Sequence, residues 1–308
     1  MTANTNWVVQ VPVATVWTSP TSAREIDEPG LTNPLRLKEW YDAMTYEPRV
    51  ALCDDNLVQS QLLYGEDVLL LEEKDGWSHI IAPHQPSKKD QRGYPGWIPS
   101  AQLKEIEDDH WDAGPVALVT TSSTTLYNLE KEPLLELSYL TILPYLDIQD
   151  GFVKVHTPNG DGFLPEADVE VYISRDDIPK GAGIDIVAAG EKFIDLPYFW
   201  GGMSSYGYDC SGFSYNMHKA NGYEIPRDAS DQVNRGKEVP LEELQPGDLI
   251  YFAYEEGKGA VHHVGIYYGD GKMLHAPKTG KNVEVLELAD TYYEKELCAA
   301  RRFWEESS

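Results

Sequence analysis

The sequence predicts an α+β protein in which two small β-barrels precede a domain of helices followed by antiparallel strands. Three observations lead to this fold class. A degenerate repeat lies within residues 1–175, the pattern changes after residue 183, and 42% of the 308 residues are hydrophobic, which is enough for packed cores. The length is compatible with two or three domains.

The repeat consists of two copies that close in the same way. The first closes with DGW (75–77) and GWIP (96–99), and the second with DGF (150–152) and GFLP (162–165). Each pair of motifs frames a short alternating strand, and another pair of strand-like segments lies upstream. Several short strands separated by turn residues predict small barrels. We place these barrels at residues 8–105 and 114–174.

The first copy is longer because it carries two insertions. In NPLRLKEWYDAM (33–44) the apolar side chains have the spacing of a short helix. The second insertion, APHQPSKKDQRGYPG (82–96), is polar. Such a segment either decorates the surface or reaches a neighbouring domain and shapes a site.

A third domain is predicted at residues 183–304, after a polar linker at 174–183. Its first part contains two helix-like segments, one ending before Pro197 and one following Asp209. Its second part alternates as strands, with a hairpin turn at GDG (269–271).

Composition excludes several classes of partner. The chain has 25 Lys and Arg against 51 Asp and Glu, a net charge of −26, which disfavours nucleic acids and anionic membranes. We find no signal-like segment and no apolar run long enough for a membrane span, so we expect a cytoplasmic protein. The three cysteines are too far apart for a CxxC motif, and Cys53 and Cys298 are interpreted as buried fillers.

Cys210 is the cysteine whose position indicates chemistry. Asp209 is a favourable N-cap residue, which places Cys210 in the first turn of the helix that follows. The unpaired N–H groups and the helix dipole at that end favour a thiolate. The small Ser211 and Gly212 leave the sulfur approachable.

Two of the eight histidines are candidates to act with Cys210. In the hairpin around GDG, His263 and His275 are predicted to lie opposite each other on one face, whereas His262 points to the other face. A thiol, an imidazole and a second polar group form a nucleophilic triad. A Cys/His/His metal site with Asp209 is the alternative. We assign the remaining five to surface positions: His79, His84, His110, His156 and His218.

Five motifs in order resemble the NlpC/P60 cysteine peptidases: YFWGG (198–202), DCSGF (209–213), RDASDQ (227–232), QPGDLIYF (245–252) and HHVGIYYGDGKMLHA (262–276). The resemblance covers residues 183–304 and implies a papain-like α+β domain. The two barrels resemble SH3b domains. Together they are similar to the subgroup of γ-D-glutamyl-L-diamino-acid endopeptidases that recycle murein peptides.

The resemblance implies a role for each matching residue. Cys210 would be the nucleophile, His263 the general base and His275 the residue that orients it. The hydroxyl of Tyr198 would help the Cys210 N–H to bind the oxyanion. No metal and no cofactor is implied.

It also implies a substrate, a free L-Ala-γ-D-Glu-diamino-acid peptide with an unblocked amine. Asp228 and Glu66 would bind that ammonium, Tyr94 of the first barrel would form an aromatic wall, and Ser211 would donate a hydrogen bond. Ala229 departs from the family, since many relatives carry serine there; Ser230 is the candidate substitute. Two alternatives stay open: a secreted hydrolase of intact peptidoglycan, and a catalytically silent protein that binds wall fragments.

Overall fold

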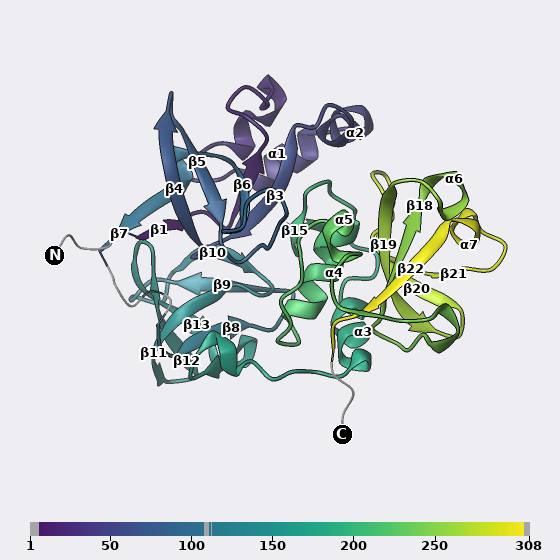
Figure 1. The fold of residues 1–308 in the computed structure, drawn as a ribbon. Helices are drawn as coiled ribbons and strands as arrows, with labels where there is room; N and C mark the ends of the chain where they lie inside the picture. The colour runs from purple at the N-terminus through teal and green to yellow at the C-terminus, as the bar shows by residue number, and fades with distance from the viewer. Residues whose placement is uncertain (1–5, 108–110, 112, 305–308) are drawn as a thin grey trace. The chain divides into compact units, whose positions relative to one another are not determined.

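The computed structural model describes residues 6–107, 111 and 113–304, and it contains two compact units (Figure 1). The first unit consists of the chain up to Pro83 together with Pro95–Ile178. The second consists of His84–Tyr94 together with the chain from Pro179 onward. The insertion at residues 84–94 is therefore part of the second unit, although the strands on both sides of it belong to a sheet of the first.

The first unit contains two seven-stranded antiparallel sheets with the same connectivity. The strand order is β3-β2-β6-β5-β4-β1-β7 in one sheet and β10-β9-β13-β12-β11-β8-β14 in the other, which is the same order shifted by seven strands. This confirms the two predicted barrel folds, and the shared strand order agrees with the repeat in the sequence. The strands of the first sheet are β1 Asn6–Val9, β2 Val13–Trp17, β3 Val58–Leu63, β4 Asp67–Lys74, β5 Trp77–Ala82, β6 Tyr94–Pro99 and β7 Leu103–Ile106. Those of the second are β8 Val116–Val119, β9 Ser123–Tyr127, β10 Pro133–Ser138, β11 Ile142–Gln149, β12 Phe152–Thr157, β13 Gly160–Pro165 and β14 Val169–Tyr172.

The glycine of each closing motif lies where two strands approach closely. A Cβ atom on Gly96 would lie 2.3 Å from Cγ1 of Val16 in β2. A Cβ atom on Gly162 would lie 2.8 Å from the carbonyl oxygen of Tyr127 in β9. The repeated glycine is thus a packing requirement of both barrels.

Helices fill the first insertion. The predicted helix is present as α1 (Leu37–Ala43), whose buried Trp40 packs over Gly30 of a 3₁₀ helix, η1 (Glu25–Gly30). Another helix, α2 (Tyr46–Asp54), follows at once and was not predicted. Its hydrophobic residues do not follow one face, and only Leu52 is buried. The periodicity that would reveal such a helix in the sequence is therefore missing.

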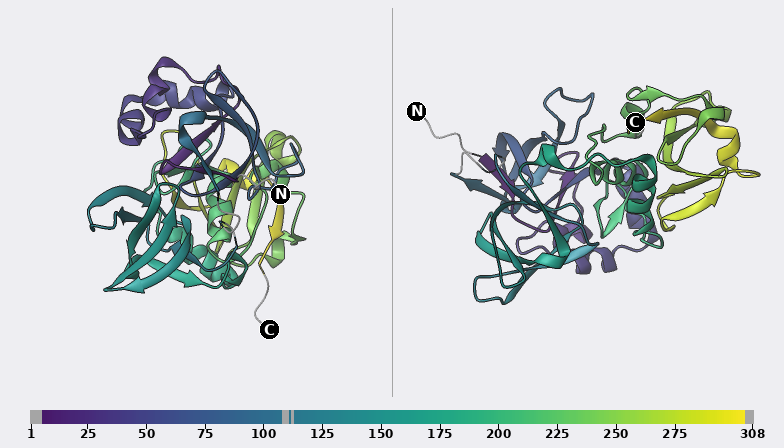
Figure 2. Two further views of the ribbon diagram at one scale, coloured as in Figure 1. Left: turned by 90° about the vertical axis from the view of Figure 1, so that its left-hand side faces the viewer. Right: turned by 90° about the horizontal axis from the view of Figure 1, so that it is seen from below.

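The second unit combines a six-stranded antiparallel sheet, in the order β17-β22-β18-β19-β20-β21, with short helices. Two of the helices, α3 (Gly183–Glu191) and α4 (Cys210–Lys219), pack on β19 and β20 of this sheet (Figures 1 and 2). The strands of the sheet are β17 Lys237–Glu238, β18 Leu249–Ala253, β19 Val261–Gly269, β20 Lys272–His275, β21 Glu284–Glu287 and β22 Leu297–Arg302. The other elements are β15 Met203–Ser204, β16 Gly207–Tyr208, α5 Ala229–Gln232, η5 Leu241–Glu243, α6 Tyr254–Gly257 and α7 Tyr292–Glu296.

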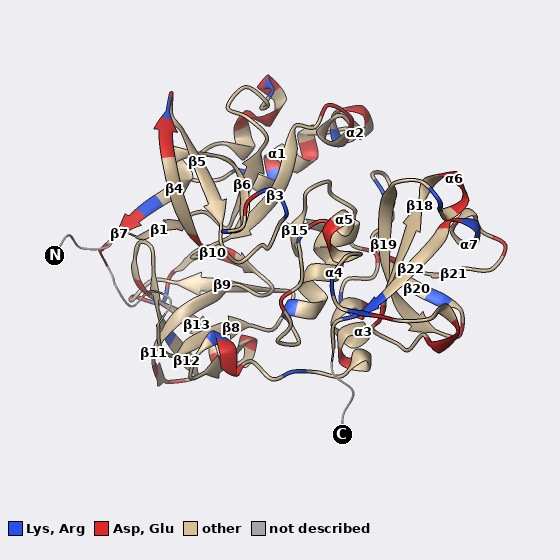
Figure 3. Ribbon diagram, in the orientation of Figure 1, with Lys and Arg blue, Asp and Glu red and all other residues tan. Residues whose placement is uncertain are grey.

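Acidic side chains are distributed over the elements of both units rather than gathered in one (Figure 3). Within the described ranges, no helix has the length and apolar character needed to span a bilayer.

Candidate active site

Cys210 is the first residue of α4, as predicted, and Asp209 is its N-cap. The Asp209 carboxylate accepts a hydrogen bond from the N–H of Gly212 (2.7 Å) and from that of Gly201 (2.9 Å). Gly212 is required here, because a Cβ atom would lie 2.2 Å from the carbonyl oxygen of Gly202. The cap therefore anchors the first turn of α4 and, with it, the half-buried thiol.

The environment of the thiol favours its neutral form. Burial, and next to it the Asp209 carboxylate, raise the pKa of Cys210 to about 12, while the backbone N–H groups of Val264 and Ser211 and the charge of Arg227 act in the opposite direction. The thiolate expected from the helix terminus is therefore not the resting form. Val264 directly follows His263 in β19, so the sulfur lies beside the strand that carries the predicted base.

The two predicted histidines form a hydrogen bond. Nε2 of His263 lies 2.8 Å from Nδ1 of His275, and both side chains are buried. Burial lowers the pKa of His263 well below its usual value, with further contributions from His275 and His262. Burial also lowers the pKa of His275 to about 3. Both imidazoles are thus neutral near pH 7.

The register of the hairpin differs from the predicted pairing by two residues. Ile266 pairs with Leu274 and Tyr267 with Met273, so His275 lies opposite Gly265 and diagonal to His263. The turn lies later than predicted, because Gly269 pairs with Lys272, and an irregularity between Tyr267 and Gly269 then changes the register by one residue. Because the shift is by two residues, both imidazoles stay on one face. A Cβ atom at position 265 would lie 3.3 Å from Cβ of His275, so Gly265 gives the rings room to meet.

Tyr198 lies beside the strand that leads to Cys210. It forms a parallel bridge with Tyr208, its N–H donates to the carbonyl oxygen of Lys281 (2.9 Å), and its side chain is buried. Its role as an oxyanion donor stays a prediction.

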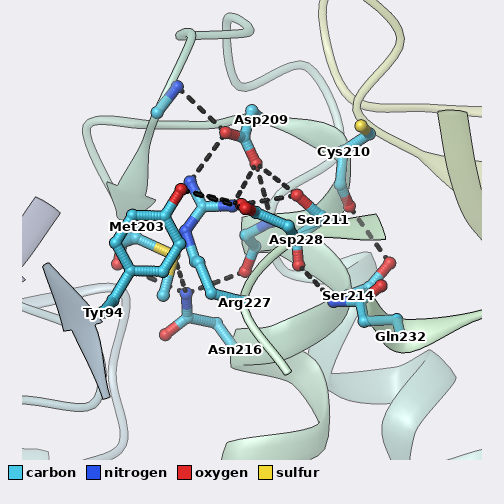
Figure 4. A network of polar contacts seen from close by, with 12 residues as sticks. Tyr94, Met203, Asp209, Cys210, Ser211, Ser214, Asn216, Arg227, Asp228 and Gln232 are labelled. Carbon is cyan, nitrogen blue, oxygen red and sulfur yellow. Dashed lines mark hydrogen bonds and ion pairs between the residues drawn. The ribbon is translucent and has the colours of Figure 1, made fainter. Parts of the chain in front are cut away.

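A buried ion pair, Asp209–Arg227, lies behind the thiol (Figure 4). The guanidinium donates to both carboxylate oxygens (2.7 and 3.1 Å) and to Oγ of Ser211 (2.9 Å). Figure 4 shows the sulfur of Cys210 pointing away from this pair. Ser211, predicted to bind substrate, is engaged with Arg227 and Asp209 in this structure.

Tyr94 and Asp228 also come together, and Lys89 joins them. The Tyr94 hydroxyl lies 3.0 and 3.1 Å from the two carboxylate oxygens of Asp228. The Lys89 ammonium lies 3.4 Å from Asp228, 4.1 Å from the centre of the Tyr94 ring, and donates to the Tyr94 hydroxyl. Burial and the Asp228 charge raise the pKa of Tyr94, which therefore stays protonated and donates to Asp228. Ser230 accepts a hydrogen bond from Lys88 (3.0 Å).

The segment that carries Tyr94 is held within the second unit by backbone contacts. The N–H of Arg227 donates to the carbonyl oxygen of Pro86 (3.0 Å), and the N–H of Lys88 donates to Asp231 (2.9 Å). The hydroxyl of Tyr215, in α4, donates to the carbonyl oxygen of His84. The helix that begins with Cys210 therefore also positions this segment.

Glu66 belongs to the first unit. It is buried in the turn between β3 and β4, where its carboxylate accepts a hydrogen bond from the N–H of Leu63 (3.1 Å). Its role in binding substrate stays a prediction.

Comparisons with known proteins match all three parts of the chain. Residues 195–302 match the NlpC/P60 family, residues 119–172 the YKFC SH3b2 domain, and residues 53–103 the bacterial dipeptidyl-peptidase Sh3 domain. A γ-D-glutamyl-L-lysine dipeptidyl-peptidase from Bacillus subtilis (strain 168) is 48% identical, over 96% of this chain and 97% of the relative. The chain belongs to the NlpC/P60 family.

A second curated relative and a solved structure support this assignment of the NlpC/P60 protein. A γ-D-glutamyl-L-lysine dipeptidyl-peptidase from Bacillus cereus (strain ATCC 10987 / NRS 248) is 40% identical, over 96% of this chain and 90% of the relative. The crystal structure of an NlpC/P60 family protein from Bacillus cereus ATCC 10987 has a TM-score of 0.93 at 39% identity, and the match covers 97% of this chain and all of that one. The resemblance drawn from the motifs is thus confirmed, and the chain is a peptidase.

Three residues around the site of the NlpC/P60 protein were missed by the sequence analysis. They are Lys89, Arg227 and Tyr293. Arg227 and Lys89 contact residues far away in the sequence, so no spacing reveals them. Tyr293 is buried in α7, and its ring centre lies 5.2 Å from that of His263 and 5.4 Å from that of His275. The Tyr-Tyr pair at 292–293 was the available signal, because one of two adjacent helical aromatics commonly faces the core.

Other sequence assignments need correction. His218 is buried in α4 rather than at the surface, and its ring packs edge-on against that of Phe303. His110 lies outside the described residues. Cys53 and Cys298 are half-buried rather than buried, and the Cys298 thiol donates to the carbonyl oxygen of Tyr251 (3.3 Å). No three His, Cys, Asp or Glu side chains gather as a metal site in the part of the chain that the structure describes.

Proposed function

We propose that the protein is a cysteine peptidase that hydrolyses the γ-D-glutamyl–diamino-acid bond of free murein peptides and releases L-Ala-γ-D-Glu. The observation that carries the proposal is the 2.8 Å hydrogen bond between His263 and His275 on the strands beside Cys210. The printed activity of the Bacillus relatives, which match over nearly their whole length, supports the choice of substrate.

The neutral resting state defines the first step of the proposed mechanism. Because Nε2 of His263 is bonded to His275, Nδ1 is the nitrogen left to take the proton of Cys210. As that proton moves to Nδ1, the sulfur attacks the γ-carbonyl carbon of D-glutamate, a C–S bond forms, and the carbonyl electrons move to oxygen.

The remaining steps return every group to its starting state. The tetrahedral intermediate collapses, the C–N bond breaks, and the amine of the diamino acid leaves with the proton from His263. Water then attacks the thioester and gives a proton to His263, the C–S bond breaks, and His263 returns that proton to the sulfur of Cys210. In this scheme the Cys210 N–H and the Tyr198 hydroxyl bind the oxyanion, and one such donor is typically worth about 2.7–4 kcal/mol of barrier.

The cluster of Tyr94, Lys89 and Asp228 supports binding of a free amine in the proposed function. Asp228 and the Tyr94 hydroxyl already hold one ammonium group, that of Lys89. The L-Ala ammonium has the same charge and donor geometry. Glu66 and Ser230 stay predicted participants, and the cytoplasmic location stays a prediction that cell fractionation can test.

Incubation with a defined tripeptide tests the function. Wild-type protein is expected to convert L-Ala-γ-D-Glu-L-Lys to L-Ala-γ-D-Glu and L-Lys, followed by mass spectrometry. Cys210→Ala should lower turnover by more than about a thousandfold, as loss of a nucleophile does, whereas Cys298→Ala should retain it. Near-normal turnover of Cys210→Ala would show that the mechanism is wrong.

Two further substrates separate the alternatives. N-acetylation of the tripeptide should abolish cleavage, because it removes the ammonium. Equal rates on both forms would discard the role of Asp228. Activity on insoluble sacculi would favour the peptidoglycan hydrolase, and the absence of any cleavage would favour a silent binding protein.

A further inference from the structure

His275 has a buried ring nitrogen that makes no hydrogen bond. Its Nδ1 is bonded to His263, but among the described residues its Nε2 has no hydrogen-bond partner. The side chain is buried, so solvent does not satisfy this nitrogen. A buried N–H donor without an acceptor costs free energy. Because His275 is bonded to the predicted base His263, the proton on this nitrogen also affects the reaction.

The proton on His275 determines whether His263 can act as a base. The 2.8 Å bond between the rings can form in two ways. If Nε2–H of His263 donates to Nδ1 of His275, then Nδ1 of His263 has a lone pair for the thiol proton and neutral His275 carries its own proton on Nε2. If instead Nδ1–H of His275 donates, neutral His263 carries its proton on Nδ1 and cannot accept another there.

An acceptor for Nε2–H of His275 would therefore select the active arrangement. Glu284 lies directly opposite His275 where β21 pairs with β20. Its Oε1 is 3.7 Å from Nε2 of His275, beyond hydrogen-bond distance in this structure. A movement of less than about 1 Å closes this gap, and Glu284 has the freedom to make it because its side chain is half exposed.

The other groups around His275 do not replace Glu284. His263 of β19 is bonded to Nδ1 of His275, so it is not the partner of Nε2. Tyr293 of α7 presents its ring to His275 at an interplanar angle of 85°. Among these neighbours Glu284 alone carries a negative charge, which also favours the imidazolium that forms on His263 during the reaction.

We propose that Glu284 is a positioning residue that holds His275 in the tautomer protonated at Nε2, so that His263 is always presented to Cys210 with Nδ1 unprotonated. Glu284 itself touches neither the substrate nor the sulfur. The inference rests on the proposed function for its effect on turnover, but its effect on the imidazoles and the thiol exists without substrate.

Three variants of the full chain test the proposal. Glu284→Ala removes the acceptor, Glu284→Gln keeps an acceptor without the charge, and Glu287→Ala removes an exposed carboxylate from the same strand. We expect Glu284→Ala to lower kcat for the tripeptide by about tenfold with little change in KM, by analogy with carboxylates that orient metal-bound imidazoles. Glu284→Gln should recover part of this loss, and Glu287→Ala should match the wild type.

Two measurements need no substrate. The rate at which iodoacetamide alkylates Cys210 at pH 8, read by mass spectrometry on the Cys210 peptide, should fall in Glu284→Ala. ¹⁵N NMR of labelled histidine should show Nε2 of His275 protonated in the wild type and a mixture of tautomers in Glu284→Ala. Wild-type alkylation and wild-type histidine spectra in Glu284→Ala would overturn the proposal. If the wild type fails to cleave the tripeptide, the proposed function fails, and these two measurements still decide the role of Glu284.

Discussion

His218 is buried in α4, and its neutral state makes the second unit sensitive to acid. Its Nδ1–H donates to the carbonyl oxygen of Ser214 (2.8 Å), and the ring of Phe303 packs edge-on against it. Burial lowers the pKa of His218 to about 4. The unfolded chain therefore binds a proton below about pH 6.5 that the folded chain does not bind until about pH 4.

We expect stability to fall as the pH drops from 6.5 towards 4. At pH 5 His218 alone should cost about 2 kcal/mol of unfolding free energy relative to pH 8. His218→Gln keeps a donor for Ser214 but does not titrate, so this part of the loss should disappear. Pulse proteolysis in urea at both pH values, with fragments of the second unit followed by mass spectrometry, measures it.

His156→Gln is the control for this experiment. His156 lies in the first unit, where it pairs with Asp161 at 2.9 Å. The acid sensitivity of the second unit should not change in this variant. Full sensitivity in His218→Gln would mean that the buried histidine is not its cause.

At the residue scale, the sequence predicts where a residue lies in a helix better than it predicts the burial or charge of its side chain. Asp209 and Cys210 were recognisable because a cap and a first turn are local features. The charge state of the thiol was not, because it depends on burial and on Arg227, which lies 18 residues beyond Asp209. Burial of His218 was missed for a similar reason, since a single polar residue on a helix does not reveal which face packs.

Among the elements, the insertion at residues 84–94 makes contacts with the rest of the second unit that the sequence did not predict. The sequence left open whether it decorates a surface or reaches another domain. The structure assigns it to the second unit, but that it shapes a substrate pocket stays a prediction. Lys89 in this segment holds an ammonium against Asp228 and Tyr94. In the proposed function this is where the substrate amine binds, so the two ammonium groups compete.

Lys89→Met should therefore tighten substrate binding. A partly exposed ion pair is worth up to about 1 kcal/mol, so KM for the tripeptide should fall by up to about fivefold with little change in kcat. Steady-state kinetics with L-Ala-γ-D-Glu-L-Lys provides the measurement. Arg92→Met, which removes a cation paired with Asp90 in the same segment instead, should leave KM unchanged. A higher KM in Lys89→Met would assign Lys89 to a substrate carboxylate rather than to a competing role.

At the element scale, the β19–β20 hairpin shows what alternation of side chains can predict and what it cannot. Alternation of side chains correctly placed His263 and His275 on one face. The exact pairing was wrong by two residues, because the turn lies between the paired Gly269 and Lys272 and a one-residue irregularity follows it in the ladder. The GDG motif does not indicate such an irregularity. The face shared by the two histidines was therefore predictable, whereas the residue-by-residue pairing of β19 with β20 was not.

At the scale of the whole molecule, the two barrels of the first unit are packed together. Tyr64 of the first barrel belongs to the hydrophobic core of the second, with Leu143 and Val153 among its neighbours. The indole N–H of Trp111 donates to the carbonyl oxygen of Gly65 (2.9 Å). A Cβ atom on Gly65 would lie 2.7 Å from Cδ2 of Leu143.

Gly65→Ala should therefore loosen this junction. Gly65 and Gly76 have nearly the same positive φ, +80° and +81°, so alanine costs about 1 kcal/mol at either position. Only at Gly65 does the new methyl group clash, which should add about 1–3 kcal/mol. Calorimetry of both variants compares them, since a Cβ atom on Gly76 would meet nothing within 4 Å. Equal losses of stability would show that the barrels are not tightly joined at this point.

The fold of each barrel was predictable, because each copy of the repeat contains its own turn motifs and its own alternation of apolar and polar residues. The joint between them was not predictable, since it depends on a glycine and a tyrosine of the first copy whose partners lie in the second copy. The same holds for the division of the chain into units, in which residues 84–94 separate from the strands on both sides of them.

This division limits how the protein can be taken apart. A fragment starting at Pro179 would contain Cys210, His263 and His275, yet it would leave the Tyr215 hydroxyl and the Arg227 amide without the backbone carbonyls of His84 and Pro86. A relative engineered to carry a different first barrel must therefore keep these eleven residues, or lose the backbone acceptors that they supply to the rest of the second unit.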